Sequence, residues 1–194
     1  CSTVEVYGEA TAGMAEETAR PQPDNVYGAS KVAAEQAALA YHREHGLDAI
    51  ALRFSWIYGP GRKTPTTLAT LLQNSLSGAV TKVPGDPSDT THYLYIDDAV
   101  DGLMRAGTVD HVGAARILNI TAGRGMPFSE VLDVARAVAP DVRVEYDARV
   151  GPSRGPAGFS QDLAEAVLGY RASTQLEVGL ARTLATLRQT PVAD

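Results

Sequence analysis

Cysteine is almost absent from this chain of 194 residues, in which Cys1 is the single example. One cysteine excludes an intrachain disulfide and a cysteine-rich zinc site, and it gives no sign of an oxidising compartment. Long apolar runs are also missing, because no stretch approaches the roughly 18 residues that a transmembrane helix needs. We therefore expect a cytoplasmic protein. The four histidines share no metal-ligand spacing, so we expect no metal site.

Positive charge is in deficit, with 17 lysines and arginines against 23 aspartates and glutamates and a net charge of −6. This balance argues against nucleic acid and against an anionic membrane surface as partners. A glycine-rich turn is missing as well, because neither G-x-G-x-x-G nor G-x-x-G-x-x-G occurs between a strand and a helix. Such a turn binds the pyrophosphate of a dinucleotide, so this chain alone lacks that site.

Helical and extended segments alternate along the chain. The clearest helix covers about 27–45, which is rich in alanine and lacks proline, and Gly46 is a stop signal. The apolar run 49–54 follows and is typical of a buried parallel strand. Further helices are expected over about 65–77, 98–106, 129–138 (with Ser129 as N-cap), 162–168 and 176–188, and further strands over 93–96, 117–120 and 142–146. The alternation predicts an α/β fold with a parallel sheet and a boundary near 60–64.

Tyr27 and Lys31 stand four residues apart in the segment Y-G-A-S-K, at the start of the clearest helix. Residues at this spacing share one face of a helix. An ammonium group beside a phenol favours the phenolate, which would suit Tyr27 to general acid/base chemistry. The pattern Y-x-x-x-K also occurs on solvated helix faces, so its meaning depends on the segments around it.

Four further segments accompany this pair. They are S-T-V-E-V-Y-G at 2–8, L-R-F-S-W-I-Y-G-P-G at 52–61, Y-L-Y-I-D-D-A-V at 93–100 and L-G-Y at 168–170. In this order and spacing, the chain resembles the extended short-chain dehydrogenase/reductase family, the NAD(P)-dependent sugar epimerases and dehydratases. The resemblance covers essentially the whole chain and implies the C-terminal part of a Rossmann-like parallel sheet plus a smaller α/β substrate-binding domain.

The resemblance also implies a missing half. In the family the glycine-rich turn lies in the first βαβ unit, so at about 30 residues per unit roughly 100 residues would precede Cys1. We interpret the start of the chain as an internal cut, with 1–60 as the incomplete C-terminal part of the dinucleotide-binding domain. Residues 61–194 would then be mainly substrate-binding domain, with some segments returning to the Rossmann domain. The isolated chain is expected to be inactive.

The resemblance assigns residue roles. Tyr27 matches the family's catalytic acid/base, and Lys31 matches the lysine that binds the nicotinamide ribose. Thr3, four residues before Tyr7 of the V-Y-G signature, matches the hydroxyl that orients the reacting oxygen. A hydride would leave the substrate carbinol carbon for the nicotinamide while Tyr27 takes the hydroxyl proton. The alternative for Thr3 is a strand-end hydroxyl that bonds the backbone. The cofactor is further expected to contact Ser2, Phe54 and Trp56.

Glu5 follows Thr3 by two positions. In family dehydratases and decarboxylases a carboxylate at this place acts as an additional base, whereas simple epimerases often have a small or apolar residue there. The nucleotide-sugar 4,6-dehydratases typically read T-D-E, and Val4 replaces their middle acid. Proton abstraction by Glu5 therefore stays open beside an exposed or merely hydrogen-bonded glutamate, while acid-assisted loss of water lacks its usual donor.

Other positions depart from the family pattern. Trp56 stands where an asparagine commonly meets substrate or nicotinamide, and its side chain either stacks on a ligand or fills the core. Thr91 and His92 stand where an arginine often grips a nucleotide-sugar diphosphate, which weakens the case for such a substrate. Arg149 lies where a second such arginine is often found, with Arg154 as a nearby substitute. Either arginine could equally be a solvated loop residue.

Our first hypothesis is an NAD(P)-dependent sugar epimerase or dehydratase, acting on a small-molecule substrate that is a sugar or nucleotide sugar. It uses NAD or NADP, and it forms a homodimer through the alanine-rich helix 27–45, because small side chains allow close helix approach. One alternative is an NAD(P)-dependent reductase or dehydrogenase with a non-nucleotide substrate. Another is a non-catalytic chain that keeps the fold, against which the intact Tyr27, Lys31 and Thr3 argue.

Overall fold

The computed structural model describes residues 1–9, 13–110, 112–147 and 155–189. The chain divides into two compact units. The first unit comprises Cys1–Ile57, His92–Gly125 and Arg154–Ser173, and the second comprises Tyr58–Thr91, Met126–Ser153 and Thr174–Asp194. Within the described ranges, no helix combines the length and apolar character that crossing a membrane requires.

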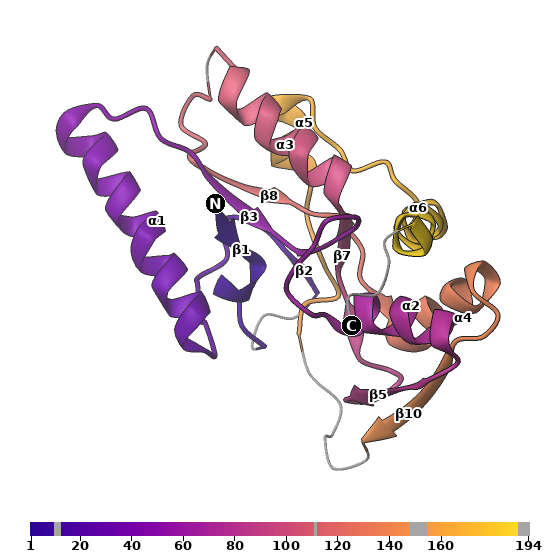
Figure 1. Cartoon of the computed structure of the whole chain (residues 1–194). Helices are drawn as coiled ribbons and strands as arrows, with labels where there is room; N and C mark the ends of the chain where they lie inside the picture. Colours follow the sequence, from indigo (N-terminus) through magenta and orange to yellow (C-terminus); the bar gives the residue numbers. More distant parts are fainter. Residues whose placement is uncertain (10–12, 111, 148–154, 190–194) are drawn as a thin grey trace. The chain divides into compact units, whose positions relative to one another are not determined.

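A three-stranded parallel sheet forms the centre of the first unit. Its order is β1 (Ser2–Thr3), β3 (Ala51–Phe54) and β8 (Ile117–Ile120). Figure 1 shows α1 (Val26–His45) on one side of these strands and α3 (Ile96–Thr108) with α5 (Asp162–Leu168) on the other. The predicted α/β fold with parallel strands is confirmed.

Side chains alternate between the two faces of this sheet, as the strand period of two requires. Leu52 and Leu118 belong to the apolar cluster beneath α3 and α5. Arg53 and Asn119, the next residues along each strand, lie on the opposite face, where the Arg53 guanidinium pairs with Glu35 of α1. The apolar cluster also contains Leu94, Ala99, Ile120, Ala164, Leu168 and Tyr170. One face of the sheet is therefore apolar and the other carries a buried polar network.

Short elements complete the first unit. A 3-10 turn η1 (Val4–Val6) follows β1 directly. β2 (Met14–Ala15) pairs in parallel with β11 (Gly158–Phe159), and β4 (Trp56–Tyr58) pairs with β7 (Tyr93–Tyr95). A second apolar cluster holds η1 in place, formed by Val4, Val6, Tyr7, Ala15 and Phe159.

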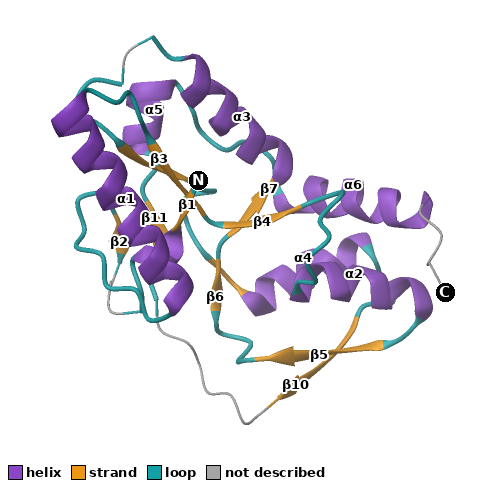
Figure 2. Ribbon diagram, turned by 60° about the vertical axis from the view of Figure 1, so that its left-hand side comes forward, coloured by secondary structure: helices purple, strands orange, loops and turns teal. Residues whose placement is uncertain are grey.

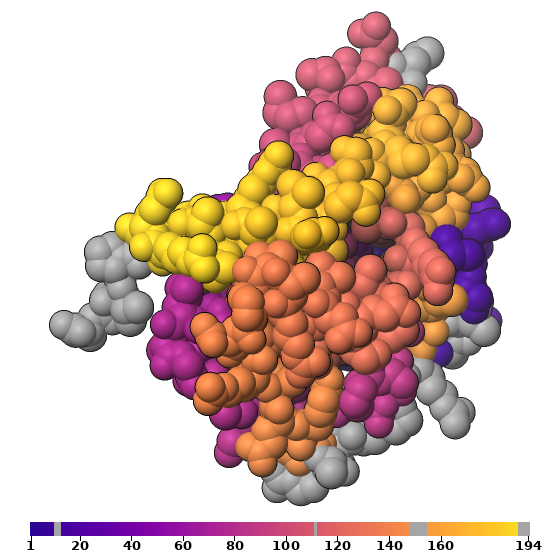
Figure 3. Space-filling view, turned by 90° about the vertical axis from the view of Figure 1, so that its right-hand side faces the viewer, coloured from indigo at the N-terminus to yellow at the C-terminus, as the bar shows by residue number. Residues whose placement is uncertain are grey.

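In the part of the second unit that the structure describes, there are two small sheets and three helices. β5 (Val80–Pro84) pairs in parallel with β10 (Arg143–Asp147), and β6 (Thr90–Thr91) pairs antiparallel with β9 (Met126–Pro127). The helices are α2 (Thr67–Ser77), α4 (Phe128–Val138) and α6 (Leu176–Gln189). Figure 2 shows α2 and α4 alongside β5 and β10, and Figure 3 shows α6, in yellow, lying along α4. The buried side chains of these helices include Leu68, Leu71, Leu72, Val131, Leu132, Ala135, Leu180 and Leu184.

Several details differ from the sequence-based expectations. Ser129 is not the N-cap of α4, because the helix already begins at Phe128. Its first N–H groups are satisfied by a distant loop: Phe128 donates to the carbonyl of Asp89 at 2.9 Å and Ser129 to that of Pro87 at 2.8 Å. β5 was not expected at all. Its buried positions are Thr81 and Val83, and because Thr81 is polar, the sequence does not show the alternation of apolar and polar residues that indicates a strand.

Candidate active site

The first turns of α1 carry Tyr27 and Lys31. Asn25 caps this helix, because its side-chain oxygen accepts from the Gly28 N–H at 2.8 Å. One turn later, the Lys31 ammonium lies 5.7 Å from the centroid of the Tyr27 ring. Tyr27 is 55% exposed, so much of its side chain faces outward. The Lys31 ammonium also donates to the carbonyl of Cys1 at 3.1 Å, which ties the helix to the start of β1.

Thr3 ends β1 and caps η1. Its hydroxyl oxygen accepts from the Glu5 N–H at 3.3 Å, which leaves the hydroxyl hydrogen for another acceptor. Thr3 pairs with Phe54 in the parallel register, so both residues stand at the carboxyl ends of neighbouring strands. The first turn of α1 presses against this turn: a Cβ added to Gly28 would lie 2.7 Å from the carbonyl oxygen of Glu5. Glycine is therefore required where the tyrosine helix meets η1.

Glu5 links three elements at this place. One carboxylate oxygen accepts from the Asn25 side-chain amide at 3.0 Å, and the other accepts from the Trp56 indole N–H at 3.1 Å. Trp56 is 45% exposed, so the expectation that it fills the core is wrong. Its ring meets Tyr93 edge-on, with 6.0 Å between centroids. The indole N–H therefore bonds a carboxylate, and the indole ring makes a T-shaped contact with a second aromatic ring.

A buried ionic network joins β1, α1 and β3. Ser2 was expected to contact the cofactor, but the residue is only 7% exposed and its hydroxyl donates to Glu35 at 2.5 Å. The same Glu35 carboxylate accepts from two nitrogens of Arg53, at 2.9 and 2.7 Å. Burial works to lower the pKa of Arg53, but its contacts with Glu35 and Tyr7 outweigh this and raise it. The Ser2 hydroxyl is thus part of a hydrogen-bond network in the protein interior.

The network continues from Arg53 to β8. The Arg53 guanidinium lies 4.8 Å from the centroid of the Tyr7 ring, and the Tyr7 hydroxyl donates to Asn119 at 2.7 Å. Burial raises the pKa of Tyr7 and also that of Glu17, whose carboxylate accepts from the Asn119 N–H. Tyr7 of the V-Y-G segment therefore has a structural place in the core.

Sequence reasoning missed Asn25 and Glu35. Asn25 had a usable signal, since an asparagine after Pro23 and before a helical run is a typical N-cap. Glu35 follows Lys31 by four residues, which places both on one helix face. That a carboxylate on this face turns inward could not be read from the pattern, because its partner Arg53 comes from a strand.

Two of the remaining predicted positions, Thr91 and His92, bond backbone carbonyls. Arg149 and Arg154 lie outside the described residues. Thr91 is buried and donates to the carbonyl of Met126 at 2.9 Å. His92 contacts the carbonyl of Pro156 at 3.1 Å, and burial lowers its pKa, partly offset by that contact.

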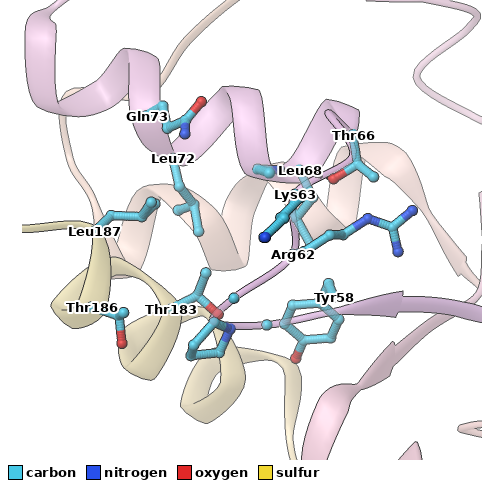
Figure 4. A pocket seen from close by; sticks show the side chains of 14 residues that line it. Tyr58, Arg62, Lys63, Thr66, Leu68, Leu72, Gln73, Thr183, Thr186 and Leu187 are labelled. Atoms are coloured by element: carbon cyan, nitrogen blue, oxygen red, sulfur yellow. Dashed lines mark hydrogen bonds between the residues drawn. The ribbon is translucent and has the colours of Figure 1, made fainter. Parts of the chain in front are cut away.

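A cavity of about 350 Å³ lies within the second unit. Figure 4 shows leucines of α2 and α6 facing it, with Arg62 and Lys63 on the loop that leads into α2. The lining thus combines apolar walls with two cationic side chains and excludes Tyr27, Lys31 and Thr3. It consists of Tyr58, Gly59, Pro60, Gly61, Arg62, Lys63, Thr66, Leu68, Ala69, Leu72, Gln73, Thr183, Thr186 and Leu187.

Comparison with characterised proteins places this geometry in context. A dTDP-glucose 4,6-dehydratase of Actinoplanes sp. is 30% identical over 96% of this chain and 58% of its own length. A UDP-glucose 4-epimerase of Mycolicibacterium smegmatis is 32% identical over 94% of this chain and 59% of its own length. The chain therefore spans somewhat more than half the length of these two curated relatives.

Solved structures agree with this likeness. MoeE5, in complex with UDP-glucuronic acid and NAD, is 32% identical and superposes with a TM-score of 0.85 over 97% of this chain and 63% of its own. The UDP-glucose 4-epimerase of Thermotoga maritima with UDP-glucose is 27% identical, with a TM-score of 0.86 over 97% of this chain and 62% of its own. The model of the NAD dependent epimerase/dehydratase family matches residues 1–121. The chain belongs to the NAD-dependent epimerase/dehydratase family.

Proposed function

We propose that the whole protein is an NAD(P)-dependent epimerase or dehydratase of nucleotide sugars. The observation that carries the proposal is the Tyr27–Lys31 pair, with 5.7 Å between ammonium and ring, on a helix whose first turn packs against the turn begun by Thr3. Relatives and solved neighbours that act on or bind dTDP- and UDP-sugars support the substrate class.

The residues present fit a nicotinamide cofactor. A lysine ammonium carries three donors, and the Cys1 carbonyl takes one of them, so Lys31 can also bind ribose hydroxyls. When bound, the cofactor would supply reversible hydride exchange with the substrate carbinol. Solved structural neighbours hold NAD or NADPH, and we propose one of these two cofactors for this protein.

Tyr27 and Thr3 have different roles at the substrate oxygen. The hydroxyl of the exposed Tyr27 takes or returns the proton at that oxygen. The Thr3 hydroxyl, whose oxygen already accepts from Glu5, donates its hydrogen and so fixes the oxygen in place. Phe54, the register partner of Thr3, borders the same strand ends.

The position after Thr3 bears on the reaction outcome. Val4 is 6% exposed and packs in the apolar cluster of Tyr7 and Phe159, so no acid is available there to assist loss of water. Glu5 accepts one N–H bond at each oxygen and keeps further lone pairs, so it can accept a proton but does not replace the missing acid. These observations favour epimerisation over dehydration.

A second candidate is a reductase or dehydrogenase acting on a substrate without a diphosphate. It is favoured by Thr91, a buried residue whose hydroxyl donates to the backbone and which offers no cation for phosphate. Arg149 and Arg154 remain proposed substrate contacts.

Turnover by the full-length protein decides between these functions. UDP-glucose and dTDP-glucose would be incubated with NAD, and the sugar products followed by NMR. Tyr27→Phe should lower turnover about 10²–10⁴-fold while NAD binding persists. Tyr41→Phe is the matched control, since Tyr41 is a similarly exposed tyrosine of the same helix. Near-normal turnover of Tyr27→Phe rejects the assigned chemistry, and absence of binding by either sugar nucleotide favours the second candidate.

We also propose a homodimer formed through α1. This helix of 20 residues buries only Gly28 and Glu35, and it exposes Ala33, Ala34 and Ala37. Small side chains permit close approach of two helices. Light scattering on the full-length protein should give a dimer, and Ala37→Arg should give a monomer. A monomeric wild-type protein well above micromolar concentration contradicts this proposal.

A further inference from the structure

Trp56 is the single tryptophan of the chain, and its indole is both fixed and open. The indole N–H donates to Glu5 at 3.1 Å, and the ring packs edge-on against Tyr93 at 6.0 Å. Even so, 45% of the residue is exposed. A large aromatic ring that is held in one orientation while much of it faces outward is suited to receive a ligand.

The position of Trp56 points to the reacting end of the site. It follows Phe54, the last residue of β3, by two positions, just as Glu5 follows Thr3, the last residue of β1. Ligands of parallel sheets bind outside the carboxyl ends of the strands. The Glu5 N–H lies 3.3 Å from the Thr3 hydroxyl oxygen, and the Glu5 carboxylate holds the indole, so Thr3 and Trp56 are joined through one residue.

The chemistry of the pair fits a sugar ring. A pyranose has an apolar C–H face, which packs on an aromatic face, and hydroxyl groups at its edge. Each Glu5 carboxylate oxygen accepts one N–H bond, from Asn25 or from Trp56, and a carboxylate has about four lone-pair sites in all. Glu5 therefore retains acceptor capacity for a hydroxyl beside the indole face.

We propose that Trp56 is a specificity-determining residue whose indole, oriented by Glu5, packs against the sugar ring of the substrate. The inference rests on the proposed function, because that function places the reacting oxygen of the sugar at Tyr27 and Thr3. Glu5 is then a positioning residue for the indole as well as an acceptor for a sugar hydroxyl.

The test uses the full-length protein with NAD and three probes: UDP-glucose, UDP-glucuronic acid and dTDP-glucose. Subtracting the emission of Trp56→Phe from that of the wild type isolates the signal of Trp56. We expect a sugar nucleotide to change this signal and UDP alone, which lacks the sugar, to leave it unchanged. Trp56→Ala should raise the dissociation constant of the bound probe about tenfold, and by clearly more than that of NAD. The dissociation constant of Trp56→Phe should lie between those of the wild type and Trp56→Ala.

Several results would overturn the inference. An equal signal change with UDP alone or with NAD alone assigns the indole to another part of the ligands. An unchanged dissociation constant in Trp56→Ala, in a protein that Tyr27→Phe inactivates, rejects the inference and keeps the proposed function. Failure of all three probes to bind the wild type rejects both. If Trp56→Ala does not fold, the emission of the wild type and the affinity of Trp56→Phe decide.

Discussion

The carboxylate of Glu35 on α1 lies 2.7 Å from the guanidinium of Arg53 on β3, and both side chains are 1% exposed. Ser2 of β1 donates to the same carboxylate. The helix that carries Tyr27 and Lys31 is thus joined to two strands of the sheet by one charged group. This attachment fixes where the tyrosine helix stands relative to Thr3.

Glu35→Ala should lower the free energy of unfolding of the full-length protein by about 3–5 kcal/mol, because the buried Arg53 would lose its partner. Denaturant titration measures the change. The double variant Glu35→Leu with Arg53→Met should recover most of the loss, since apolar residues replace both charges. A loss below about 1 kcal/mol in Glu35→Ala would mean that the pair does not hold the helix.

Gly28→Ala should destabilise the protein by about 1–3 kcal/mol, because the new Cβ would lie 2.7 Å from the Glu5 carbonyl oxygen and 2.9 Å from the Cβ of Pro23. Turnover should fall as well, since α1 must shift away from η1. Gly107→Ala is the matched control: this glycine of α3 has no atom within 4 Å of an added Cβ. Its replacement should stabilise the helix by about 0.5–1 kcal/mol. Equal effects of the two substitutions on the melting temperature contradict the prediction.

His92 should make stability depend on pH. Burial lowers its pKa below the usual 6.5, so the unfolded chain takes up a proton at a higher pH than the folded protein does. The free energy of unfolding should therefore decrease as the pH falls through 6.5 toward the folded pKa, and the contribution should level off below it. His92→Gln keeps an N–H for the carbonyl of Pro156 and should remove this part of the pH dependence. Identical pH profiles for variant and wild type would disprove the assignment.

Lys31→Ala should weaken both NAD binding and turnover, because a charged donor that faces the Tyr27 ring and bonds the Cys1 carbonyl is lost. A hydrogen bond to a charged group contributes about 1.5–3 kcal/mol, so the dissociation constant of NAD should rise roughly 10–100-fold. Calorimetric titration of the full-length protein measures it. Lys82→Ala, at an exposed position of β5, should leave the dissociation constant of NAD unchanged. Unchanged NAD affinity in Lys31→Ala would remove Lys31 from the cofactor site.

The helices and the four strands expected from the sequence agree with the structure to within a few residues, whereas several short strands and β5 were not expected. The expected helix 27–45 corresponds to α1, and Gly46 adopts the left-handed conformation with φ 69° that its stop signal implied. Strand 117–120 and helix 162–168 have the predicted bounds. These predictions depend on local composition and capping, which act over one or two turns of chain. β5 was missed because only its pairing with β10 shows it to be a strand.

The sequence by itself determined that Tyr27 and Lys31 share one face of α1, since their four-residue spacing is a property of one helix. Only the tertiary structure decided what surrounds them. The Ser2 hydroxyl donates to the buried Glu35 carboxylate. Trp56 stays partly exposed, with its indole N–H bonded to Glu5. Both outcomes depend on partners far away in the chain. A polar or aromatic side chain goes where its hydrogen bonds are satisfied, and the strands and helices that supply those bonds meet only when the chain is folded.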